Sequence, residues 1–264
     1  MSKYAETFRL SFKMQIVWRF DVAMTMLATV CRILAAWILW SAVFGGRETV
    51  SGFTFDSMLS YYIVSSFINS MDKSHRISGE VSHLIRDGGF SKHMAVPMDP
   101  LGFFGAMATG EAAFTLGFNC VAVIICAYLF GIRITFASDP AVILIAVLMT
   151  LLGIIFLLCF HYLLGILSFV FLSIGGLNFF FGNIIGFATG AIVPLALLPA
   201  GAQNFMRLLP FYYVNYLPAM LLTGRNAGEA PAGLAAMAAW TAVLLLLTRL
   251  SYNRLRARYE GAGI

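Results

Sequence analysis

Three residues that could do acid–base or charge chemistry lie deep inside long apolar segments of the chain: Arg32, Glu111 and His161. Charged groups are costly in hydrocarbon and mark functional or structural partners. Arg32 and Glu111 lie at similar predicted depths, so they could form an ion pair, contribute to a transport path or make no contact. A single histidine without nearby ligands is more typical of a hydrogen-bonded core residue than of a metal site.

No catalytic motif accompanies these residues. The sequence has no G-x-S-x-G, no H-E-x-x-H and no G-x-x-x-x-G-K-[ST], so it lacks the hydrolase, zinc-protease and P-loop patterns. The four cysteines lie within apolar runs and lack metal-ligand spacing. We therefore predict no catalytic residue and no metal site on this chain. A membrane-embedded enzyme stays an alternative, although it would need clustered titratable residues in the spans.

The composition indicates an integral membrane protein. Hydrophobic residues make up 60% of the 264 residues, charged residues only 11%, and the mean hydropathy is +0.87. A soluble domain carries roughly a quarter charged residues. We predict an all-α fold of one transmembrane domain, because each apolar run can cross a core of about 30 Å. The six predicted spans are residues 22–44, 55–72, 102–130, 140–170, 177–198 and 232–250.

The basic residues predict how the chain is oriented. Twelve of the 17 Lys and Arg flank the side that holds both termini, namely Lys3, Arg9, Lys13, Arg19, Lys73, Arg76, Arg86, Lys92, Arg249, Arg254, Arg256 and Arg258. Four flank the other side: Arg47, Arg133, Arg207 and Arg225. This bias predicts cytoplasmic N- and C-termini in a bacterial-type cytoplasmic (inner) membrane. Because these charges adjoin apolar runs, we expect membrane lipids and no nucleic acid as their partner.

Two segments on the cytoplasmic side have a helical pattern. In residues 1–21, aromatic or apolar residues recur every four positions from Tyr4 to Phe20, which predicts an amphipathic interfacial helix. That helix could be a basic membrane anchor or a contact surface for a cytoplasmic partner. The loop 73–101 contains a helical face that ends before Gly88-Gly89 and is formed by Ile77, Val81, Leu84 and Ile85. A short helix followed by a return to the membrane is typical of a docking element.

On the outer side, residues 199–224 are apolar but interrupted by Pro199, Pro210 and Pro218. Proline breaks helices, so this segment is too interrupted to span. We predict a re-entrant segment of two short helices in the outer leaflet, with Phe211 and the following tyrosines at the interface.

The second and fifth predicted spans are unusual in composition. The second carries a polar row, Tyr61, Ser65 and Asn69, which should face protein or a wet cavity because lipid solvates it poorly. The fifth carries two overlapping G-x-x-x-G motifs formed by Gly182, Gly186 and Gly190. Such motifs let helices approach closely, either within one chain or across a dimer axis.

The order of these elements resembles the membrane subunit of type-2 ABC exporters, especially the branch whose permeases are encoded as neighbouring pairs. Two stretches carry the resemblance. The first is Gly190-Ala191-Ile192-Val193-Pro194-Leu195 with Leu198-Pro199, Leu209-Pro210-Phe211-Tyr212-Tyr213 and Pro218; the second runs from Ile85 to Pro97 and includes Asp87-Gly88-Gly89. Ala95 departs from the family pattern, which often has a basic residue before this proline.

The resemblance implies partners and roles that spacing alone does not. ATP and Mg would bind to separate ABC ATPase subunits, leaving no cofactor on this chain, and a second permease, identical or related, would pair with it. The resemblance assigns ATPase coupling to Ser78, Glu80, Val81, Leu84, Ile85, Arg86 and Asp87. It places the substrate path and dimer axis near Tyr61, Ser65, Asn69, Asn178, Phe179, Asn183 and Phe187.

The same resemblance leaves the cargo open. Aromatic side chains near the fifth span favour small amphipathic or cationic compounds exported from the cell. Lipids, peptides and glycans are alternatives, as is an assembly factor without transport. The sequence alone does not give the direction of transport or distinguish a homodimer from a heterodimer.

Overall fold

The computed structural model describes residues 3–17, 19–129, 131–171, 173–191 and 193–258. Residues 18, 130 and 192, which belong to predicted elements, lie outside these ranges. The described residues form helices and no strand. The elements are α1 (Lys3–Val17), α2 (Arg19–Phe44), α3 (Phe55–Met71), α4 (His75–Arg86), α5 (Ser91–Ala95), α6 (Pro100–Leu129), α7 (Pro140–Ile166), η1 (Leu167–Phe169), α8 (Gly175–Ala188), η2 (Leu195–Leu197), α9 (Ala200–Met206), η3 (Tyr212–Tyr216), α10 (Leu217–Leu222), η4 (Ala227–Glu229), α11 (Ala230–Leu255) and η5 (Arg256–Arg258).

The helical class predicted from composition is confirmed, and four segments of the described chain are long and apolar enough to cross a membrane. They are Ala23–Phe44, Pro100–Leu129, Pro140–Phe169 and Ala227–Leu255. The third of these begins at a clear signal: Asp139 caps α7 by accepting a hydrogen bond from the Ala141 N–H at 2.9 Å, and Pro140 occupies the first turn.

The two helices that correspond to the remaining predicted spans are shorter. α3 has 17 residues and α8 has 14, or about 25 Å and 21 Å at about 1.5 Å per residue. α8 ends at Ala188, before the predicted end of the span at residue 198. The reason is Gly190, whose φ of +72° is left-handed and ends a helix. Gly190 therefore lies beyond the helix and does not extend the helical G-x-x-x-G pattern.

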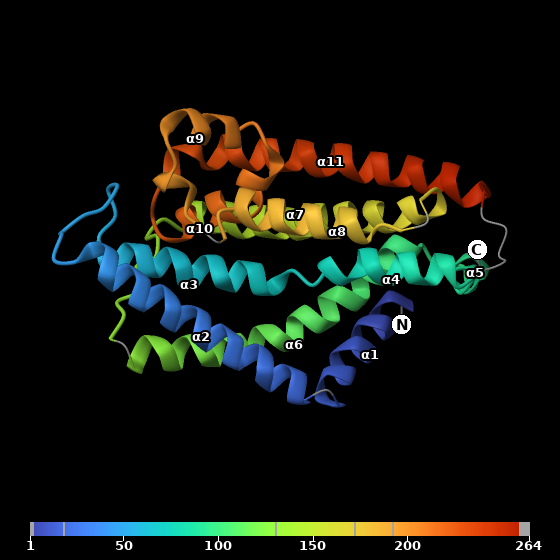
Figure 1. The fold of residues 1–264 in the computed structure, drawn as a ribbon, viewed down its shortest axis with the longest axis horizontal. Helices are drawn as coiled ribbons and strands as arrows, with labels where there is room; N and C mark the ends of the chain where they lie inside the picture. Colours follow the sequence, from blue (N-terminus) through green and yellow to red (C-terminus); the bar gives the residue numbers. More distant parts are fainter. Residues whose placement is uncertain (1–2, 18, 130, 172, 192, 259–264) are drawn as a thin grey trace.

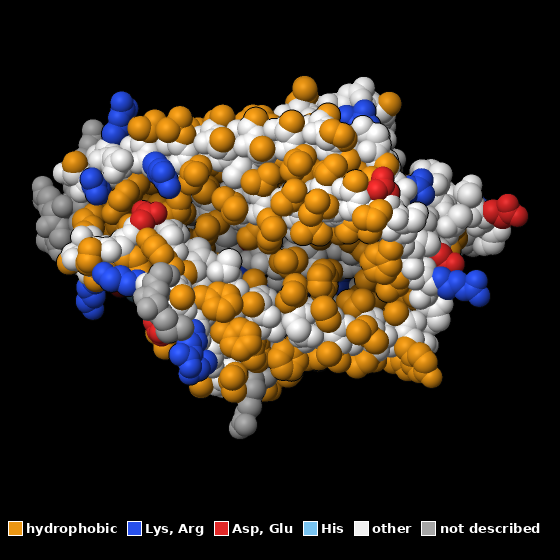
Figure 2. Space-filling view, turned by 180° about the vertical axis from the view of Figure 1, so that it is seen from behind, with side chains coloured by type: hydrophobic (Ala, Val, Ile, Leu, Met, Phe, Trp, Pro, Cys, Tyr) orange, Lys and Arg blue, Asp and Glu red, His pale blue; other side chains and the backbone are white. Residues whose placement is uncertain are grey.

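Charged and apolar side chains are separated along the long axis of the molecule. In Figure 1, α1, α4 and α5 lie at one end with the last turns of α11, while α9 and the loop after α2 lie at the other. Figure 2 shows hydrophobic side chains over the middle of one face and charged side chains toward the two ends. This distribution matches a membrane protein whose middle faces hydrocarbon.

α7 is the central helix of the packing. It contacts α11, α10, η3 and α4, and the contact with α4 lies near its end, at Gly165. Small residues permit these approaches: a Cβ at Gly153 would lie 3.1 Å from the Val214 carbonyl oxygen of η3, and one at Gly233 of α11 would lie 3.2 Å from the Met149 Cε of α7. An α-helix without a side chain at the crossing allows neighbouring backbones to come this close.

The outer segment folds differently from the prediction in one respect. It does form short helices, α9 and α10, joined by η3. However, Tyr212 and Tyr216 are buried, only 2% and 4% exposed, and do not lie at an interface. Tyr216 packs edge-on against Tyr61 of α3, with the two ring centroids 5.9 Å apart. Aromatic side chains in a proline-broken segment can thus fill a core as readily as they can face headgroups.

We expect Gly190→Ala to destabilise the fold by about 1–3 kcal/mol. An added Cβ would be strained at φ +72° and would sit 3.0 Å from the Tyr61 hydroxyl. Gly182→Ala is the matched control, because a Cβ there meets nothing within 4 Å and alanine favours helix. Thermal unfolding of the purified chain followed by circular dichroism measures both. Equal melting temperatures for the two variants would contradict the assignment of strain to Gly190.

Candidate functional site

The site is built around α4, a short helix at the charged end of the molecule. It begins after a turn in which the Asp72 carboxylate accepts hydrogen bonds from the Ser74 N–H at 2.9 Å and hydroxyl at 2.6 Å. It ends at Gly88, whose φ is +74°, and the Phe90 N–H donates to the Leu84 carbonyl at 2.9 Å. Local sequence therefore sets both ends of α4.

The apolar face of α4 packs onto α7 of the same chain. Ile77, Val81 and Ile85 are at most 3% exposed. The approach is close because α7 carries Gly165 at the contact: a Cβ there would lie 2.8 Å from the Val81 Cβ and 3.2 Å from the Ser78 carbonyl oxygen. Burial of three branched side chains stabilises the contact by roughly 1.5–3 kcal/mol each. α4 is thereby fixed to a long membrane helix.

Polar and aromatic contacts extend this attachment beyond α7. The Ser168 hydroxyl of η1 donates to the Ser82 hydroxyl at 2.6 Å in a buried position. Phe90, fully buried just after α4, packs edge-on against Phe169 at 5.6 Å and Tyr252 of α11 at 6.4 Å. Two helix ends that reach this side of the molecule, those of α7 with η1 and of α11, therefore hold α4 and the turn that follows it.

The opposite face of α4 is polar and exposed. It presents Glu80, His83, Arg86 and Asp87, with the His83 Nδ1 lying 3.1 Å from an Asp87 carboxylate oxygen. Of the residues assigned to ATPase coupling, Glu80, Arg86 and Asp87 are thus accessible and Leu84 is half-buried. Ser78, Val81 and Ile85 are buried against α7, so they hold the helix in place and are not open to solvent.

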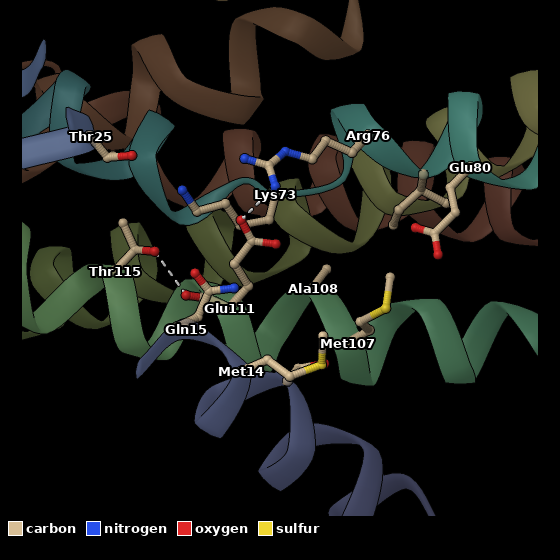
Figure 3. A pocket seen from close by; sticks show the side chains of 12 residues that line it. Met14, Gln15, Thr25, Lys73, Arg76, Glu80, Met107, Ala108, Glu111 and Thr115 are labelled. Atoms are coloured by element: carbon tan, nitrogen blue, oxygen red, sulfur yellow. Dashed lines mark hydrogen bonds and ion pairs between the residues drawn. The ribbon is translucent and has the colours of Figure 1, made fainter. Parts of the chain in front are cut away.

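Glu111 pairs with a different arginine from the one considered in the sequence. Its carboxylate lies 3.5 Å from the Arg76 guanidinium of α4, and the ion pairs among the described side chains do not include Arg32 (Figure 3). Arg32 is exposed on α2. Of the three alternatives for Arg32 and Glu111, the described ion pairs agree with no contact between them, because Glu111 of α6 faces Arg76 at the start of α4.

Burial perturbs the charged groups beside this pair. It lowers the pKa of the Lys73 ammonium, and the neighbouring Glu111 partly opposes that effect. Burial also raises the pKa of Glu80, and repulsion from Glu111 adds to the rise. These opposite directions follow from desolvation, which disfavours the charged form of either group.

The three residues of the polar row of α3 lie in different environments: two are buried and one is exposed. The buried Tyr61 hydroxyl donates to the Gly190 carbonyl at 2.9 Å, and the buried Ser65 hydroxyl accepts from the Asn215 side-chain amide at 2.7 Å. These two residues thus connect α3 to the residues that follow α8 and to η3, so this part of the row faces protein, one of its two predicted environments. Asn69, one turn further, is exposed.

α8 presents an open face. Phe179 is 77% exposed and Phe187 43%, and Asn183 between them is exposed while its side-chain amide donates to the Phe179 carbonyl at 2.7 Å. Gly182 lies on this face with nothing within 4 Å of a built Cβ. Gly186 and Asn178 are half-buried. The glycines of α8 therefore do not make a close helix contact at Gly182 within this chain.

A polar cluster at the outer end was missed in the sequence. Glu229, just before α11, accepts hydrogen bonds from Arg207 at 2.9 Å, Tyr212 at 2.8 Å and Asn226 at 3.0 Å. These bonds connect the outer segment to α11. Arg207 entered the sequence argument only as one of four outer cations, and Glu229 is one of several acidic residues on that side, so charge alone did not identify it as the partner.

His161 of α7 is 7% exposed, and its Nδ1 has no hydrogen-bond partner among the described residues. Within the same residues, no group of three or more His, Cys, Asp or Glu side chains is placed to hold a metal ion.

The comparison with known proteins adds one finding. Residues 30–263 match the profile of a family described as ABC-2 family transporter protein. The matched residues include α4, α8 and the outer segment, while α1 precedes them. A search of curated proteins gave no match.

We expect Gly165→Leu to displace α4, because overpacking a tight contact costs about 1–3 kcal/mol. The displacement can be measured in a Ser82→Cys/Ser168→Cys background, where the two hydroxyls are 2.6 Å apart. Oxidation should give a high yield of the linked peptides by mass spectrometry, and Gly165→Leu should lower it. Gly117→Leu in α6 is the control, since a Cβ there meets nothing within 4 Å. An unchanged yield for Gly165→Leu would refute the close contact.

Proposed function

Because this chain belongs to the ABC-2 transporter family, we propose that it is the permease subunit of an ATP-driven exporter whose ATPase is a separate chain. Members of this family are membrane transporter subunits, and the apolar helices fit a multi-pass membrane protein. The chain itself would carry out no catalysis. ATP and Mg would be bound by the partner ATPase.

The observation that carries this proposal is the attachment of α4 to α7. A helix that transmits movement from an ATPase needs one face fixed to the membrane helices that move and another face open to the ATPase. α4 has a buried apolar face held at Gly165 and an exposed polar face at the basic end of the molecule. Closure of two ATPases would then move α4 and the membrane helices as one body.

The proposed topology has six crossings with both termini in the cytoplasm of a bacterial-type inner membrane. α3 and α8 supply the two crossings beyond the four long helices. Support comes from their position: α3 runs in line with α4 in Figure 1 and from the outer end to the inner one. The basic side chains near α1, α4 and the end of α11 support the cytoplasmic assignment.

We further propose that the open face of α8 pairs with a second permease, either a copy or a related chain. Two exposed aromatic rings beside Asn183 would border the path at this axis. Aromatic faces attract organic cations and apolar groups. Small amphipathic or cationic compounds are therefore the proposed cargo, moved outward past the segment that Glu229 connects to α11.

We expect Arg86→Glu to reduce co-purification of the ATPase about tenfold or more, because a reversed charge at an interface costs several kcal/mol. The chain would be tagged in its host, solubilised gently and analysed by mass spectrometry. Arg47→Glu, an exposed arginine at the opposite end, is the matched control and should have no effect.

The Ser82–Ser168 cross-link serves as the folding check in the same preparations. Loss of the ATPase with an intact cross-link would support docking on the exposed face of α4. Recovery of no ATPase with the wild-type chain in several mild detergents would overturn the exporter proposal. Normal recovery with Arg86→Glu would reject this face as the docking surface.

We expect Gly182→Leu to weaken pairing between two permease subunits while leaving the single chain folded. Leucine at this exposed site meets nothing within its own chain but would hold a neighbouring helix away. Differently tagged subunits, or the tagged chain and its co-purified permease, report pairing by pull-down. Gly117→Leu, equally open on α6, should pair normally. Full pairing by Gly182→Leu would exclude this part of α8 from the interface.

A further inference from the structure

A charged cavity of about 390 Å³ lies between α1, α2, α4 and α6. Figure 3 shows Lys73, Arg76, Glu80 and Glu111 around it, with Gln15 of α1 beside Glu111. The cavity thus contains two cationic and two anionic side chains from three separate elements. Glu80 also belongs to the exposed face of α4, but neither the proposed coupling nor the proposed pairing gives this cavity a ligand.

The packing of α1 places this cavity at the membrane–water boundary. A Cβ at Gly102 would overlap the Tyr4 ring, and one at Gly110 would overlap the backbone of Phe8. α1 therefore covers the first ten residues of α6, and Glu111 follows directly. On its outer side α1 exposes apolar residues: Leu10 is 60% exposed and Val17 77%. An amphipathic helix with this surface lies at headgroup level, so the cavity does too.

An apolar groove of about 440 Å³ adjoins the charged cavity. It runs between α6 and α7, where Leu116, Ile155 and Leu158 line it. The two cavities share Lys73 and Ala108 in their linings. A charged compartment at headgroup depth beside an apolar groove between membrane helices matches the two parts of a lipid molecule.

The balance of charges specifies the headgroup. Arg76 and Glu111 already pair, but the Arg76 side chain is 67% exposed, so this pair is weak and its guanidinium can also bind an anion. Among the described side chains, the ion pairs include neither Lys73 nor Glu80. One cation and one carboxylate thus remain to bind a ligand of both charges. A purely anionic headgroup would be repelled by Glu80.

We propose that these cavities bind a phospholipid whose headgroup carries a phosphate and a primary ammonium, such as phosphatidylethanolamine. The phosphate contacts Lys73 and Arg76, the ammonium contacts Glu80, and an acyl chain occupies the groove between α6 and α7. Such a lipid joins α1, α4 and α6, and so links the composition of the inner leaflet to the position of α4. The site does not depend on the direction of transport or on the cargo.

Native mass spectrometry of the purified, delipidated protein tests the site. Phosphatidylethanolamine, phosphatidylglycerol and phosphatidylcholine of equal chain length are titrated separately. We expect one phosphatidylethanolamine to bind about tenfold more tightly than the other two, since only its primary ammonium can donate charged hydrogen bonds to Glu80. Free phosphoethanolamine, which lacks acyl chains, should not bind at these concentrations.

Three variants locate the binding. Lys73→Gln should weaken phosphatidylethanolamine about tenfold, because the phosphate loses a charged donor. Glu80→Gln should reverse the preference in favour of phosphatidylglycerol, because the ammonium loses its acceptor and the net charge of the site becomes positive. Arg86→Gln, on the same helix but outside both cavities, is the matched control and should bind like the wild type.

Several results would overturn the proposal. Equal binding of the three lipids by the wild type, or equal effects of Lys73→Gln and Arg86→Gln, would mean non-specific annular lipid. Tight binding of free phosphoethanolamine would assign the cavity to a soluble ligand. Displacement of the lipid by dodecyltrimethylammonium at comparable affinity would make the cavity an entry site for cationic cargo. ATPase co-purification is measured separately. A negative lipid-binding result therefore leaves the test of the proposed function intact, and a negative co-purification result leaves the lipid test intact.

Discussion

The absence of a side chain at Gly165 is the constraint on which the charged end of this protein depends. Because α7 has no Cβ there, Val81 and the backbone of Ser78 reach the surface of a long membrane helix. That contact determines which face of α4 is buried and which is open. It also fixes the start of α4, and with it the position of Arg76 beside Glu111. The Arg76–Glu111 ion pair and the position of α4 beside the cavity both depend on this one close helix crossing.

Much of the architecture could be predicted from the sequence, because membrane proteins follow composition and periodicity closely. Long apolar runs identified the four long helices, and the spacing of Ile77, Val81 and Ile85 identified α4. The pattern could not say whether this apolar stripe meets a partner or the chain itself, since burial of a stripe looks the same in either case. That distinction requires knowing that Gly165, eighty residues further on, lies opposite Val81.

The remaining errors share a physical origin in tertiary contacts. Gly190 fits a helical repeat in the sequence but adopts a left-handed φ, because its carbonyl binds the Tyr61 hydroxyl. Glu111 pairs with Arg76 at the start of α4, whereas the sequence offered Arg32 as one possible partner. Glu229 gathers three donors from residues that are distant or unremarkable in the sequence. Each of these depends on where two elements meet.

The length of α8 has a consequence for biogenesis. At about 21 Å it is shorter than a hydrocarbon core of about 30 Å. In the proposed topology, where α8 crosses the membrane, a single subunit would therefore thin the bilayer around α8 or place the chain that flanks it at membrane depth. Both are unfavourable until another protein covers the region. A copy without the proposed second permease would consequently be a substrate for membrane quality-control proteases, which would limit this chain to the amount of that permease.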